Sequence, residues 1–106
     1  MAVIAEQDLD IADSAAKMAV RIFAPEQRDL STWGCRCEVG EPVAEVIETD
    51  GVSSLQALAL AIQELAAALY STELYRSGQL GAFVAFDGYL GIPAPSSFKN
   101  IAPHTF

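Results

Sequence analysis

The stretch that decides the fold reads Asp50-Gly51-Val52-Ser53-Ser54-Leu55-Gln56-Ala57-Leu58-Ala59-Leu60-Ala61 and continues to Tyr70. Asp50, Ser53 and Ser54 each offer a side-chain oxygen that can cap the start of a helix. From Leu55 onward the chain is rich in Ala, Leu, Gln and Glu, residues that favour helix. The stretch therefore predicts one long helix over residues 55–70, which could continue to Arg76 before Gly78 ends it.

The two sides of this predicted helix differ in character. One side carries large apolar residues at steps of three and four, the spacing of a buried stripe: Leu55, Leu58, Ile62, Leu65 and Leu69. The other side carries polar or small residues, with one large apolar residue among them: Gln56, Gln63, Glu64 and Ala67, with Leu60 in the middle. We expect the first side to face a sheet and the second to face outward.

Four segments before the helix alternate between apolar and polar residues, which predicts strands. They are 3–11, 18–22, 33–39 and 43–49, with a polar loop over 26–32 and a turn at Gly40-Glu41-Pro42. The segment 43–49 is apolar on parts of both faces, so we expect a partner element on each side of it. After the helix, Asp87-Gly88 between two apolar runs predicts a two-residue hairpin turn.

These elements predict an α+β fold, a mostly antiparallel sheet of about four to six strands packed on one long helix. The length of 106 residues suits a single domain, which we place at residues 1–95. Residues 96–106 read as an irregular C-terminal tail. The predicted core consists of Trp33, Cys35, Cys37, Leu58, Ile62 and Leu65.

Three segments resemble a family of small bacterial domains of unknown function. They are Trp33-Gly34-Cys35-Arg36-Cys37, the helix start from Asp50 to Ala61, and Leu90-Gly91-Ile92-Pro93. The similarity extends over roughly residues 18–95, although the spacing from Asp50 to Gln56 is longer than in the family pattern. The resemblance implies a bacterial origin and a compact α+β fold, and it brings no activity and no functional residue.

The charge balance limits the classes of partner. The chain has 14 acidic and 6 basic residues and a net charge of −8, which argues against nucleic acid, whose binding relies on Lys and Arg. The longest charge-free apolar run is too short to cross a bilayer, so we expect no membrane partner. The N-terminus lacks the basic region of a secretory signal. We therefore expect a cytoplasmic protein.

The residues that could carry chemistry do not form a recognisable motif. The single histidine, His104, lies in the predicted tail, away from any candidate nucleophile. Cys35 and Cys37 have no second pair of ligands for zinc, and we interpret them as buried residues of a strand. The acids from Asp8 to Asp13 do not follow a calcium-loop pattern, and Glu45 and Glu48 point to opposite strand faces. We expect no enzyme activity, no catalytic residue, no metal and no cofactor.

The leading functional hypothesis is a non-enzymatic interaction domain that forms a homodimer. Its candidate interface is the outer side of the helix, namely Leu60, Gln56, Gln63, Glu64 and Ala67, or the edge of the sheet. An alternative is an acidic immunity- or antitoxin-like protein that neutralises a basic partner by electrostatic attraction. A third is a small-molecule-binding domain with a pocket lined by Phe83, Phe86 and Tyr89.

Overall fold

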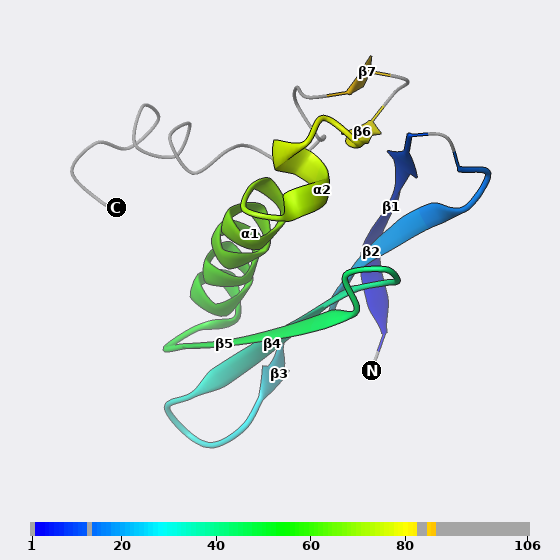
Figure 1. Ribbon diagram of the computed structural model, residues 1–106. Coiled ribbons are helices and arrows are strands. Elements are labelled where there is room, and N and C mark those ends of the chain that lie inside the picture. Colours follow the sequence, from blue (N-terminus) through cyan, green and yellow to red (C-terminus); the bar gives the residue numbers. More distant parts are fainter. Residues whose placement is uncertain (1, 13, 83–84, 87–106) are drawn as a thin grey trace.

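The alternating segments form one antiparallel sheet, and the Ala- and Leu-rich segment forms a helix across one face of it (Figure 1). This computed structural model describes residues 2–12, 14–82 and 85–86. In chain order the elements are β1 (Val3–Ile11), β2 (Lys17–Phe23), β3 (Glu26–Gln27), β4 (Trp33–Val39), β5 (Glu45–Gly51), α1 (Ser54–Tyr70), α2 (Glu73–Arg76), β6 (Leu80–Ala82) and β7 (Ala85–Phe86). The predicted α+β class, with one long helix on an antiparallel sheet, is confirmed.

The strand β4 is the centre of the sheet. On one edge it pairs with β5 along its whole length, from Trp33 opposite Gly51 to Val39 opposite Glu45. On the other edge it pairs first with β3 and then with β2. The sheet continues from β2 to β1, β6 and β7, each pair antiparallel. Pro25 lies between β2 and β3, where its missing N–H interrupts the ladder, and residues 26–27 of the predicted loop form β3.

The core lies on the face of the sheet that α1 covers. Because successive strand residues point to opposite faces, the apolar members of each strand gather on that side, where they are buried: Leu9, Met18, Val20, Cys35, Cys37, Val39 and Ile47. Of the predicted core, Cys35, Cys37 and Leu65 are buried, and Trp33 and Leu58 pack against the buried cluster. Ile62 is half-buried.

The helix α1 meets the sheet through small residues. Ala57 and Ala61 are fully buried, and the Thr49 hydroxyl donates a 2.8 Å hydrogen bond to the backbone oxygen of Ala57. Gly51 lies so close that an added Cβ would come within 2.6 Å of the Ala57 nitrogen. The helix backbone can approach this closely only because no large side chain intervenes.

Because α1 lies so close to the sheet, its buried side differs from the stripe predicted from the sequence. Leu65 and Leu69 are buried as predicted, and Leu58 and Ile62 are half-buried. Leu55, predicted to belong to the same stripe, is 74% exposed. This part of the prediction is wrong because Leu55 lies in the first turn, beyond the end of β5, while the alanines turn toward the sheet.

Side-chain hydrogen bonds set both ends of α1. Of the three possible caps, Ser53 is the one used, since its hydroxyl accepts from the Gln56 backbone N–H at 3.1 Å. At the other end, the Thr72 hydroxyl donates to the Leu69 oxygen and accepts from the Tyr75 N–H. Thr72 therefore caps the separate helix α2, and the predicted unbroken continuation to Arg76 is interrupted.

One further boundary differs from the sequence-based prediction. The strand β5 begins at Glu45 rather than Val43, because residues 40–44 close a turn in which Ala44 has a positive φ of 53° and donates its N–H to the Gly40 oxygen. After the helices, the first strand pair forms earlier in the chain, with Ala82 opposite Ala85, and this pair does not test the turn predicted at Asp87-Gly88. That dipeptide and the predicted tail 96–106 lie outside the described residues.

The contact between Gly51 and Ala57 gives a stability prediction. Replacing Gly51 by Ala forces the helix away from β5, and we expect the free energy of unfolding to fall by about 1–3 kcal/mol. Gly40→Ala is the matched control, since its Cβ would first meet a backbone atom at an ordinary 3.4 Å. Urea unfolding measures both, and equal midpoints for the two variants would contradict this account of the helix contact.

Candidate interaction surface

The face of the sheet opposite α1 is charged. The Lys17 Nζ lies 2.6 Å from the Asp10 carboxylate, and the Arg21 Nε lies 2.6 Å from that of Glu6. These hydrogen-bonded carboxylates raise the pKa of Lys17 and of Arg21. The acidic strand faces expected from the sequence are therefore interspersed with bases. No element among the described residues covers this face at β5, so the second partner element predicted for that strand is not found there.

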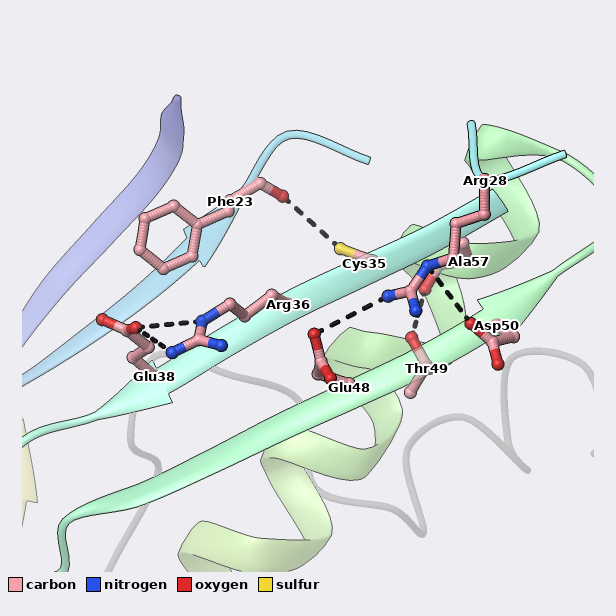
Figure 2. A network of polar contacts seen from close by, with 9 residues as sticks. All are labelled: Phe23, Arg28, Cys35, Arg36, Glu38, Glu48, Thr49, Asp50 and Ala57. Atoms are coloured by element: carbon pink, nitrogen blue, oxygen red, sulfur yellow. Dashed lines mark hydrogen bonds and ion pairs between the residues drawn. The ribbon is translucent and has the colours of Figure 1, made fainter. Parts of the chain in front are cut away.

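Arg28 crosses the open face near β4 (Figure 2). It comes from the loop after β3 and lies over Gly34, where any Cβ would overlap its guanidinium. Its nitrogens lie 3.6 Å from carboxylate oxygens of both Glu48 and Asp50. Beside it lies a hollow of about 210 Å³. Its charged lining residues are Arg28, Arg36, Glu26 and Glu48, and its uncharged ones are Ala24, Gln27 and Gly34. The two positive and two negative charges of this hollow balance one another.

Exposed apolar residues gather at one end of the sheet. Leu30, Val52 and Leu55, which we call the apical patch, are 100%, 75% and 74% exposed. They belong to the β3–β4 loop and to the start of α1, and both segments leave the sheet at the same end because Trp33 pairs with Gln27 and with Gly51 (Figure 1). Arg28, Asp29 and Asp50 supply charge beside them.

Local hydrogen bonds hold the apical patch in place. Arg28 and Asp29 both donate backbone N–H groups to the Thr32 oxygen, which closes the loop. The Asp29 carboxylate accepts the Ser31 N–H at 2.8 Å, and this bond lowers the pKa of Asp29. Leu30 sits at the tip of that turn. On the helix side, the Gln56 side chain accepts the Val52 N–H at 2.7 Å. These bonds fix the backbone that carries the patch.

This patch was not predicted from the sequence. Leu30 stands alone between Asp29 and Ser31, and Val52 precedes the helix-capping serine, so neither belongs to an apolar pattern. The available signal was a large apolar residue isolated in a polar loop. Only the strand pairing shows that these isolated residues share one end of the molecule.

The residues predicted as an interface lie together on the outer side of α1. Gln56, Leu60, Glu64 and Ala67 are exposed and Gln63 is half-buried. Leu60 is the apolar centre of this group but is only 36% exposed, much less than the residues of the apical patch. Gln56 also stabilises the start of α1, because its side-chain oxygen accepts a hydrogen bond from the Val52 N–H.

Cys35 and Cys37 belong to the core. Their exposed fractions are 1% and 0%, and the Cys35 thiol donates to the Phe23 oxygen (Figure 2). Burial raises the pKa of Cys35 and raises that of Cys37 to about 12. Because the thiolate is the nucleophile and the metal ligand, this environment opposes both roles.

The remaining candidates are metal ligands, the residues of the predicted pocket and membrane-spanning helices. Among residues 2–12, 14–82 and 85–86 no three metal-ligating side chains come together. His104, Asp13, Phe83 and Tyr89 lie outside the described residues, as does the side-chain environment of Phe86. In the part of the chain that the structure describes, neither helix has the length and apolar character needed to span a membrane.

The buried thiols give a pH prediction. Unfolded cysteines ionise around pH 9.0, whereas folded Cys37 keeps its proton to about pH 12. Above pH 9.0 the unfolded state thus binds fewer protons, so stability declines from there toward pH 12. We expect Cys37→Ala to be less stable at pH 7 but to decline less between these pH values in urea titrations. Rapid labelling of both thiols by a thiol reagent in the folded protein at pH 8 would contradict the buried assignment.

Comparison with known proteins places the chain in a family. No curated protein and no solved structure matches it. The family model described as a domain of unknown function, DUF6968, matches residues 5–94. That range begins within β1 and contains the other described strands and both helices, as well as the segments 33–37, 50–61 and 90–93 that resemble a domain of unknown function. The chain belongs to the DUF6968 family.

Proposed function

We propose that this protein is a non-enzymatic interaction domain that contacts a partner protein through the apical patch. The observation that carries the proposal is the exposure of Leu30, Val52 and Leu55 at one end of the sheet. Burying such side chains removes apolar surface from water, which favours association. An apolar centre with charged neighbours is the usual anatomy of a protein interface.

The hydrogen bonds around the patch support this role. Asp29 and Thr32 shape the loop that presents Leu30, and Gln56 fixes the backbone at Val52. A surface that is already ordered loses less conformational entropy when it binds. Loops held by a rigid sheet commonly carry binding residues.

The hollows on the open face give less support to small-molecule binding. They measure about 210 and 280 Å³, below the range of about 300–1,000 Å³ that is typical of ligand pockets. Among the described residues, the exposed apical patch thus gives more support to an interaction role than these two hollows give to ligand binding. Free Cys35 and Cys37 suit a reducing compartment, and a cytoplasmic, bacterial setting belongs to this proposal.

Affinity capture from the source organism tests the proposal. The bait is the full chain, compared with the triple variant Leu30→Ser/Val52→Ser/Leu55→Ser. Val3→Ser/Ile4→Ser is the matched control, because these residues are 45% and 51% exposed but lie on β1. We expect a partner that the wild type and the control retain and that the triple variant loses by about tenfold or more. Equal recovery by all three baits would overturn the assignment of the patch.

The outer side of α1 carries a second candidate role, self-association. The supporting observation is that Leu60 lies among Gln56, Gln63, Glu64 and Ala67 on one outward side. If this side forms a two-fold dimer, light scattering at micromolar concentration gives twice the chain mass, and Leu60→Lys gives the single mass. Ala15→Lys, in the exposed turn after β1, is the control. A single mass for the wild type would remove this candidate without affecting the apical patch.

A further inference from the structure

The outer edge of β5 has no strand beside it among the described residues. The strand β5 pairs only with β4, along all seven of its residues. On the other edge, the described residues form no backbone hydrogen bond with it. Alternate backbone groups of this edge therefore present unpaired donors and acceptors, which is the arrangement that accepts an added strand.

This edge is acidic. Glu45, Glu48 and Asp50 lie within β5, which has no basic residue of its own. The carboxylates of Glu48 and Asp50 are 52% and 65% exposed, and their nearest base, Arg28, stands 3.6 Å from both. At that distance Arg28 forms ion pairs without close hydrogen bonds, so both carboxylates can still accept hydrogen bonds from a partner.

The charges disfavour a second copy of the chain at this edge. A two-fold antiparallel pairing centred on Glu48 would place Glu48 directly opposite its own copy, with Glu45 and Asp50 adding further negative charge. Like charges opposite each other destabilise a pair of strands. A strand that carries Lys or Arg would instead place opposite charges beside these acids, which stabilises a strand pair.

We propose that the β5 edge receives an extended basic segment of a partner protein as an added antiparallel strand. Its basic side chains lie on the open face beside Glu48 and Asp50, which point to that face together with Val46. The strand β5 leads directly into Val52 of the apical patch, so an apolar residue at that end of the segment reaches the patch. This inference rests on the proposed interaction function but uses different residues.

A binding titration tests the charge requirement. The probe is a fluorescent peptide of alternating arginine and threonine, as long as the seven residues of β5, and the reference peptide has glutamate in place of arginine. We expect the full chain to bind the arginine peptide at low salt at least about tenfold more tightly than the reference, and to release it at high salt. Equal affinity for the two peptides would overturn the proposal.

Matched variants locate the site. Glu48→Gln/Asp50→Asn weakens binding of the arginine peptide by about tenfold. Asp8→Asn/Glu73→Gln removes the same number of charges from exposed positions on β1 and α2 and leaves binding nearly unchanged. If both pairs weaken binding equally, attraction to the net charge of −8 explains the result and the β5 site is rejected.

Backbone methylation distinguishes strand addition from charge attraction alone. Methylating the peptide nitrogens of the arginines, or those of the threonines, blocks hydrogen bonding along one edge of the peptide at a time. Strand addition requires that one methylated peptide loses binding while the other retains it. Retention by both would contradict the proposal. Failure here, combined with loss of the captured partner by the apical-patch variant, would reject the strand site and leave the interaction function standing.

Discussion

The approach of α1 to the end of β5 is the contact on which the rest of the structure depends. Gly51 has no side chain, Ala57 and Ala61 present the smallest one, and the Thr49 hydroxyl bonds to the Ala57 oxygen. Together they let a helix lie almost directly on the strands β4 and β5. That contact buries the apolar faces of both strands and the two cysteines, and it places the core on one face of the sheet.

Among the described residues, no element covers the opposite face at β5 or pairs with the outer edge of this strand. Exposed ion pairs such as Arg21–Glu6 are screened by solvent, so the charges of the open face add little to stability. Their arrangement instead affects which partners can approach. The charged residues of both β1 and β5 are all acids, but Glu6 and Asp10 of β1 form close ion pairs with Arg21 and Lys17 of β2. Beside β5, the hydrogen-bonded turns at Asp29 and Ser53 hold Leu30 and Val52 in exposed positions.

The positions of the strands and of α1 were predictable from the sequence, whereas the contacts between them were not. Alternation identified four strands to within a few residues, and composition identified α1, because these signals are local. The error at Leu55 came from assigning the largest residues to the buried side, when the smallest ones allow the closest approach. The break at Thr72 depends on the two hydrogen bonds of its hydroxyl, which periodicity does not reveal.

The sequence by itself determined the α+β class, the alternating faces of the strands, the burial of Cys35 and Cys37 and the acidic character of the surface. These follow from residue type and spacing, which act over a few neighbouring positions. Only the tertiary structure decided that Leu30, Val52 and Leu55 share one end and that β5, with three acids and no base, lies at an edge of the sheet formed by the described residues. Both results come from strand order and register, because pairing brings together residues whose separation along the chain hides their proximity.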